Sequence, residues 1–134
     1  MHVSMIRIAI ITLVALGLWG VGGISFTHWA GQTPCPTIGL IPACYIIFVG
    51  YGLVLVSMYP NLKTSLGVFL IGWVPVISLA LVGVIGEITS MLHCPISEVG
   101  IPKCYFSAAL SLLIGLLYWR FYKIQLSKQL SETK

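Results

Sequence analysis

The sequence predicts an all-α, polytopic membrane protein, a bundle of four transmembrane helices made of two tandem helical hairpins. Of the 134 residues, 58% are hydrophobic and only 7% are charged, whereas a soluble domain carries about 25% charged residues. Between Arg7 and Lys63 there is no Asp, Glu, Lys or Arg. Lipid must therefore surround this stretch. A duplicated cysteine motif, described below, predicts the two hairpins.

Four apolar stretches are long enough, or nearly so, to cross a hydrocarbon layer, which takes about 20 helical residues. They run over residues 8–28, 43–59, 65–92 and 103–122. Pro42 and Pro60 bracket the short second stretch as helix stops. Pro75 predicts a kink in the long third stretch. We interpret the first stretch as a retained helix and not a cleaved signal peptide, because no small-residue cleavage site precedes the first cysteine.

The basic residues predict the orientation in the membrane. With four spans, both termini lie on the same side as the turn over 59–65. That side carries Arg7, Lys63, Arg120, Lys123, Lys128 and Lys134. The opposite side carries Lys103 alone. Because Lys and Arg collect in cytoplasmic loops, we expect cytoplasmic termini in an inner or plasma membrane, with the loops over 29–43 and 93–103 outside. The net charge of +4 then reflects topology and anionic lipid, and nothing indicates nucleic acid.

The two predicted outer loops share one motif, which holds all four cysteines. The first loop reads CPTIGLIPACY over 35–45, and the second reads CPISEVGIPKCY over 94–105. Two spans separate the copies, so both halves have the same orientation, which predicts a pseudo-two-fold axis along the membrane normal. We therefore divide the chain into a first hairpin repeat at 1–62, a second at 63–124, and a cytoplasmic tail at 125–134 that frays.

The motif sets the chemistry of its cysteines. The proline two residues before Cys44 and Cys104 suits the first helical position, where a missing N–H costs nothing. Both cysteines then fall in the first helical turn, whose positive dipole favours the thiolate. Cys35 and Cys94 lie in the extended loop ahead, each followed by proline. Both pairs face the oxidising compartment, where disulfides persist.

Two interpretations of these pairs stay open. In one, the disulfides are permanent, and closing loops of about ten residues adds somewhat under about 3 kcal/mol to stability. The chain is then a non-enzymatic subunit or interaction module of a larger membrane complex, with no cofactor. In the other, the pairs exchange with one another and relay electrons. The spacing leaves open whether pairing is within each loop or between the loops.

Cysteine pairs on the outer loops of a four-helix membrane bundle resemble the DsbB and vitamin K epoxide reductase families of membrane disulfide-forming enzymes. The resemblance covers the topology of most of the chain and not the motif, since those families carry a Cys-x-x-Cys pair and this chain has none. It implies a thiol–disulfide oxidoreductase that passes electrons from an exported thiol protein to a quinone. Cys44 or Cys104 would be the attacking thiolate, and Cys35 and Cys94 the resolving partners.

The resemblance also implies roles for residues near the outer boundary. Trp29, Tyr45 and Tyr105 would line a quinone-sized pocket. Glu87 or His93 would handle protons. The alternative for Glu87 is a snorkelling carboxylate paired with Lys103 or His93.

A third class of function is a small transporter or metal-handling protein that works as a homo-oligomer. His28 and His93 lie near the cysteines, where a soft metal is conceivable. Their spacing matches no metal motif, so we predict no metal ligands. The polar residues in the middle of the predicted spans are few: Tyr51, Ser57, Ser78 and Ser111. They give little support for a water-lined path.

Overall fold

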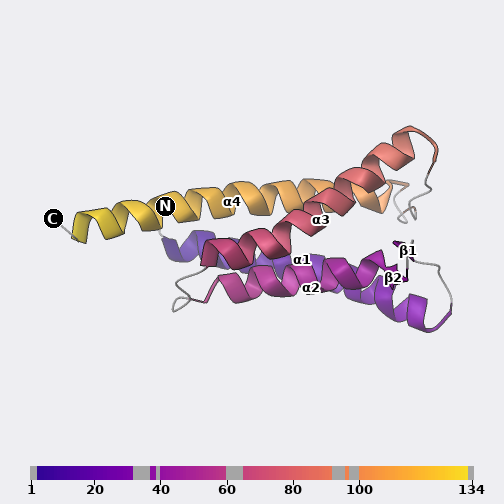
Figure 1. The fold of residues 1–134 in the computed structure, drawn as a ribbon, viewed down its shortest axis with the longest axis horizontal. Helices are drawn as coiled ribbons and strands as arrows, with labels where there is room; N and C mark the ends of the chain where they lie inside the picture. The colour runs from indigo at the N-terminus through magenta and orange to yellow at the C-terminus, as the bar shows by residue number, and fades with distance from the viewer. Residues whose placement is uncertain are drawn as a thin grey trace.

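The computed structural model describes residues 3–31, 37–38, 40–59, 65–91, 96 and 100–132, without the side chains of residues 27, 28 and 38. In this part the fold is all-helical apart from two short strands. The elements are α1 (Val3–Trp29), β1 (Thr37–Ile38), β2 (Ile41–Pro42), α2 (Ala43–Ser57), α3 (Ser65–Ile88) and α4 (Lys103–Glu132). The helices lie along one long axis, and each runs antiparallel to the next (Figure 1).

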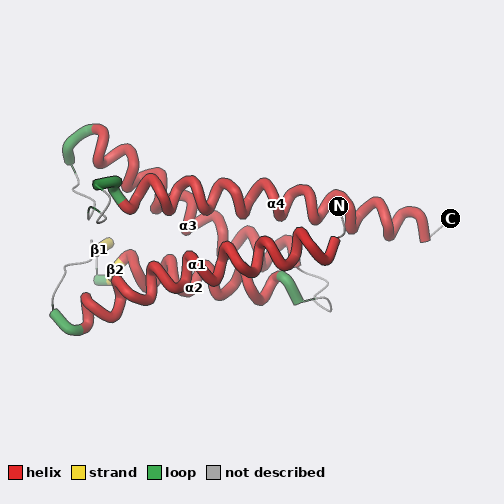
Figure 2. Tube along the Cα trace, turned by 180° about the vertical axis from the view of Figure 1, so that it is seen from behind, coloured by secondary structure: helices red, strands yellow, loops and turns green. Residues whose placement is uncertain are grey.

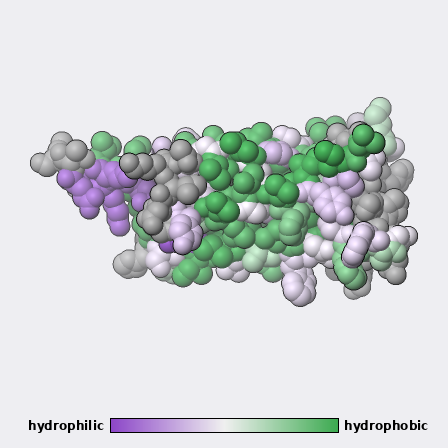
Figure 3. Space-filling view, turned by 60° about the horizontal axis from the view of Figure 1, so that its bottom comes forward, coloured by the Kyte–Doolittle hydropathy of each residue, from purple (hydrophilic) through white to green (hydrophobic). Residues whose placement is uncertain are grey.

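Three of the helices, α1, α3 and α4, are long and apolar enough to cross a membrane, which agrees with the prediction of a membrane protein. Helix α2 is equally apolar but has 15 residues, and at about 1.5 Å per residue it falls short of a hydrocarbon layer of about 30 Å. Figure 3 shows the apolar side chains gathered over the middle of the molecule, with a hydrophilic patch at the end formed by the last turns of α4.

The helices pack as a ring in which each touches its neighbours in sequence. Helices α2 and α3 share the most extensive contact, and α1 closes the ring by packing on both α2 and α4. The loop end, as we call it, holds the end of α1, the strands, the start of α2, the end of α3 and the start of α4 (Figure 2). The terminal end holds the start of α1, the end of α2 and the start of α3, and α4 extends beyond them (Figure 1).

The core is a stripe of side chains from all four helices. Its buried members include Ile6, Ile10 and Val14 of α1, Tyr51 and Val54 of α2, Phe69 and Val76 of α3, and Leu110, Ile114 and Tyr118 of α4. The rings of Phe69 and Tyr118 stack with centroids 3.6 Å apart. The indole of Trp73 lies on Gly115, and its Nε1 donates a 2.8 Å hydrogen bond to the Ser111 carbonyl, which ties α3 to α4.

Helix α3 continues through Pro75, and its second half leans away from α2 (Figure 1). It ends at Ile88, before the predicted boundary at 92. Ser90 adopts a left-handed φ of 56°. The Ser90 N–H donates to the Glu87 carbonyl at 3.1 Å, and the Met91 N–H donates to the Gly86 carbonyl at 2.9 Å. This is a Schellman motif, which satisfies carbonyls at a helix end.

Two sequence expectations about helix ends are wrong. The tail over 125–134 does not fray in its described part, because α4 is helical to Glu132. Its Gln, Leu, Lys and Glu residues are good helix formers. Pro42 is not the first helical residue but the N-cap, with an extended ψ of 131°, and Ala43 begins the helix.

Candidate functional site at the loop end

One backbone pairing recurs in both cysteine motifs. In the first loop, β1 and β2 pair antiparallel with Thr37 opposite Pro42. In the second loop, an isolated antiparallel bridge joins Ile96 to Pro102. In each case the residue two places after the first cysteine pairs with the proline two places before the second. The two copies of the motif therefore close in the same register.

The second cysteine of each motif lies where the sequence predicts it, in the first turn of a helix. Cys44 is the second residue of α2, and Cys104 is the second residue of α4. Both are disulfide-bonded. Cys44 is buried, at 9% exposure, and Cys104 is half-buried. Cys35 and Cys94 lie outside the described residues.

The starts of α2 and α4 carry no carboxylate in the first turn, and Pro42 makes no side-chain cap at the start of α2. Backbone N–H groups in the first turn of a helix have no intrahelical partner, and they give that end partial positive charge. Acidic side chains in the first turn of the same helix therefore do not offset this charge near Cys44 and Cys104.

Large apolar side chains project from the loop end. Ile41 and Ile101 occupy equivalent places in the two motifs, and each is 55% exposed. Leu40 is fully exposed, and Met91 and Ile96 are largely exposed. An exposed apolar group of this kind, carried on short loops, is typical of a contact surface for protein or membrane.

The three residues that the resemblance assigns to a quinone pocket lie at the loop end, and only one of them, Tyr45, lines the apolar groove found there between α2 and α3. Trp29 is the last residue of α1 and is 82% exposed. Tyr45 lines an apolar groove of about 280 Å³ between α2 and α3, together with Val49 and Pro75. Neither Trp29 nor Tyr105 lines that groove.

Glu87 lies in the last turn of α3 at the loop end, half-buried. His93 lies outside the described residues, as does the side chain of His28. The described residues contain no group of three or more His, Cys, Asp or Glu side chains that could hold a metal ion.

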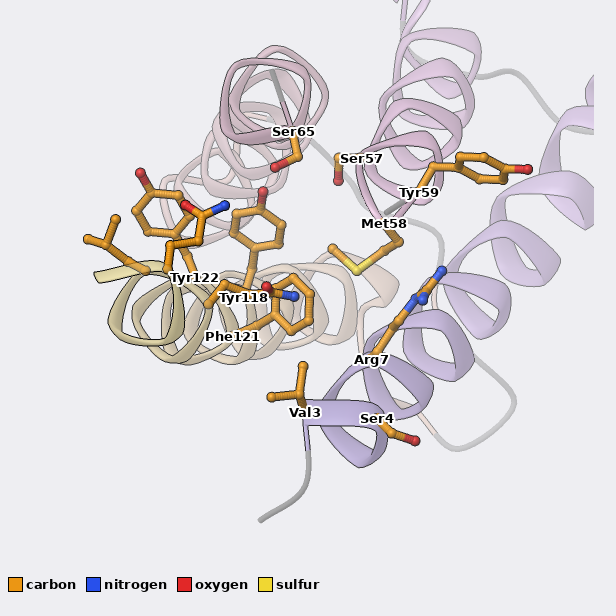
Figure 4. A pocket seen from close by; sticks show the side chains of 13 residues that line it. Val3, Ser4, Arg7, Ser57, Met58, Tyr59, Ser65, Tyr118, Phe121 and Tyr122 are labelled. Carbon is orange, nitrogen blue, oxygen red and sulfur yellow. The ribbon is translucent and has the colours of Figure 1, made fainter. Parts of the chain in front are cut away.

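Sequence reasoning missed a cavity of about 680 Å³ that lies at the opposite, terminal end. All four helices line it (Figure 4). Arg7 is the one charged side chain among its described lining residues. The Tyr118 hydroxyl points toward the side chain of Ser65 across the cavity. The available signal was the group of Ser, Tyr and Gln residues around the predicted cytoplasmic boundary.

Three of the polar residues predicted for the middle of the spans have defined hydroxyl environments in the described part of the bundle. Ser57 donates to the Val54 carbonyl at 2.6 Å, and Ser111 donates to the Ser107 carbonyl at 2.9 Å, so both hydroxyls are satisfied within their own helices. Tyr51 is 2% exposed, and its hydroxyl approaches Ser107 without reaching hydrogen-bonding geometry.

Comparison with known proteins finds no match: no family model, no curated protein and no solved structure is similar to this chain.

Proposed function

We propose that the chain is a non-enzymatic membrane module whose two disulfide-closed loops form one outward-facing surface for a partner protein. The observation that carries this proposal is the bridge register common to both loops. Thr37 pairs with Pro42 in the first loop, and Ile96 pairs with Pro102 in the second. In both motifs the paired residues are two positions away in sequence from the two cysteines.

This register supports a disulfide within each loop, because each bridge brings together two residues that are close in sequence to the two cysteines of the same motif. The burial of Cys44 supports a structural role for its disulfide, since exchange requires an accessible sulfur. A loop fixed in this way loses little conformational entropy when it binds. The exposed Ile41 and Ile101 are then preorganised contact residues, one on each loop.

The proposal includes a membrane topology of four spans in two tandem hairpins. The termini are cytoplasmic, and the loop end is external. The ring packing of α1 to α4 supports it, because a two-fold axis would relate α1 to α3 and α2 to α4. The apolar composition of α2 supports a fourth span despite its length. The excess of basic residues toward the terminal end supports the orientation.

The second candidate is the quinone-linked thiol–disulfide oxidoreductase. The observation that favours it is that Cys44 and Cys104 are disulfide-bonded at helix starts without carboxylates, at one end of the bundle. An exported dithiol would be oxidised to a disulfide while a loop disulfide is reduced. The loop dithiol would then pass two electrons and two protons to a quinone near Tyr45 and Tyr105.

The redox behaviour of the purified full-length protein separates the two candidates. The protein in detergent is incubated with millimolar glutathione, with and without a soluble quinone, and free thiols are counted by gel shift after alkylation with a polyethylene glycol maleimide. The module predicts that both disulfides stay closed under native conditions and open only after unfolding. Reduction of one loop in the folded protein, reversed by quinone, would establish the oxidoreductase instead.

A further inference from the structure

The cavity at the terminal end has the form of a site for an amphiphile. It opens between the start of α1, the end of α2, the start of α3 and the second half of α4 (Figure 4). Helix α4 continues to Glu132 and extends beyond the other helices (Figure 1), and its Gln125 and Gln129 line the cavity. The cavity therefore spans the boundary between the apolar bundle and the polar part of α4.

The polar side of the cavity suits an anion. Arg7 is the one charged group among its described lining residues, and Ser4, Gln125 and Gln129 add neutral hydrogen-bond donors. The two described acidic residues lie elsewhere: Glu87 is at the loop end, and Glu132 is at the last turn of α4 and does not line the cavity. A planar guanidinium with additional donors matches the oxygens of a phosphate ester.

The apolar side suits acyl chains. Val3, Met58, Phe121 and Leu126 line the same cavity. Arg7 immediately precedes the long apolar run of α1, and the aromatic side chains around Tyr118 and Tyr122 mark the level at which a membrane interface meets the bundle. An anion held at this depth is at the height of a lipid headgroup.

We propose that this cavity binds a phosphate ester through Arg7, and that the ester is the headgroup of an anionic phospholipid whose chains lie along Val3, Phe121 and Leu126. The same phosphate chemistry occurs in soluble anions, which lack the apolar part. The apolar half of the lining favours the lipid.

The test is lipid retention by the full-length protein in detergent, measured by native mass spectrometry with phosphatidylglycerol or phosphatidylcholine. We expect phosphatidylglycerol to bind more tightly, and Arg7→Gln to weaken it about tenfold or more, since a hydrogen-bonded charge contact is worth about 1.5–3 kcal/mol. Arg120→Gln is the matched control. It removes one exposed cation that does not line the cavity, and we expect less than about twofold change.

Arg7→Lys keeps the positive charge that favours a cytoplasmic N-terminus, but it removes the planar guanidinium group that can donate two parallel hydrogen bonds. This variant remains informative if Arg7→Gln fails to fold. We expect it to weaken phosphatidylglycerol binding by a smaller factor than Arg7→Gln. Equal losses in the Arg7→Gln and Arg120→Gln proteins, or equal retention of the two lipids, would overturn the site. Binding of inorganic phosphate alone, dependent on Arg7 and able to displace the lipid at millimolar concentration, would overturn the lipid as its occupant.

Discussion

Gly50 of α2 and Gly72 of α3 lie against each other's backbone where the two helices cross. A Cβ atom on Gly72 would stand 2.6 Å from the Gly50 carbonyl oxygen, and a Cβ on Gly50 would stand 2.7 Å from that of Gly72. Both residues are buried. In lipid, helices associate through packing, and small residues let their backbones approach. This contact explains why α2, the shortest helix, packs so extensively on α3.

The first prediction concerns this crossing. Gly50→Ala should destabilise the protein by about 1–3 kcal/mol, because the added methyl group meets backbone and the side chain of Val76, which forces the helices apart. Unfolding in detergent mixtures measures the change. Gly52→Ala is the control, since nothing lies within 4 Å of its added Cβ. Equal stability of the two variants would mean that the close approach of α2 and α3 is absent from the protein in lipid.

The second prediction compares the removal of the hydroxyl group from two buried tyrosines, Tyr51 and Tyr118. The Tyr51 hydroxyl is buried without a hydrogen bond, whereas that of Tyr118 points to Ser65. Because an unsatisfied buried polar group costs about 1–3 kcal/mol, Tyr51→Phe should leave stability unchanged or raise it by about 1 kcal/mol. Tyr118→Phe should not raise stability, because the Tyr118 side chain lines the cavity and its hydroxyl is not among the buried groups without a partner. The same unfolding assay gives both values, and a loss on Tyr51→Phe would reveal a bond to Ser107.

The third prediction concerns the link between α3 and α4. Trp73→Phe removes the hydrogen bond to the Ser111 carbonyl and leaves a space over Gly115. We expect a loss of at least about 1 kcal/mol in the free energy of unfolding. Trp119→Phe is the control, because Trp119 is exposed and contacts only the Lys123 ammonium among its described ring contacts. Similar effects from the two variants would contradict a specific role for Trp73.

The fourth prediction tests the proposed pairing of the cysteines. Cys44→Ser should lower stability by somewhat under about 3 kcal/mol, the value expected for a closed loop of about ten residues. The double variant of Cys35 and Cys44 should lose no more than the single variant, because both changes remove one disulfide. Peptide mapping under non-reducing conditions should still find Cys94 joined to Cys104. Loss of that second disulfide in the single variant would mean that the loops are cross-linked to each other.

Much of the fold was predictable because its signals are local. The starts of α2, α3 and α4 at Ala43, Ser65 and Lys103 coincide with the predicted boundaries, and two of them follow a proline. The end of α3 was not predictable, because Ser90 adopts a conformation that usually calls for glycine or asparagine. The continuation of α4 was missed because its polar residues were interpreted as a solvated tail, although their helix propensity is high.

In the candidate sites too, some features were predictable from local sequence and others were not. The placement of Cys44 and Cys104 in a first helical turn follows from the motif alone. The bridges at Pro42 and Pro102 join residues within one short loop, but proline is uncommon in strands, so the sequence carries no ordinary strand signal there. The cavity around Arg7 is lined by residues from four helices, including the extension of α4, so no single stretch of the sequence predicts it.

The position of Trp73 gives the molecule an internal optical reporter. Trp19, Trp29 and Trp119 are all more than half exposed, whereas Trp73 is partly buried and hydrogen-bonded across to α4. In a variant with phenylalanine at the other three tryptophan positions, the fluorescence emission of Trp73 would change when α3 and α4 separate. Binding events at either end of the bundle could then be followed spectroscopically without an added dye.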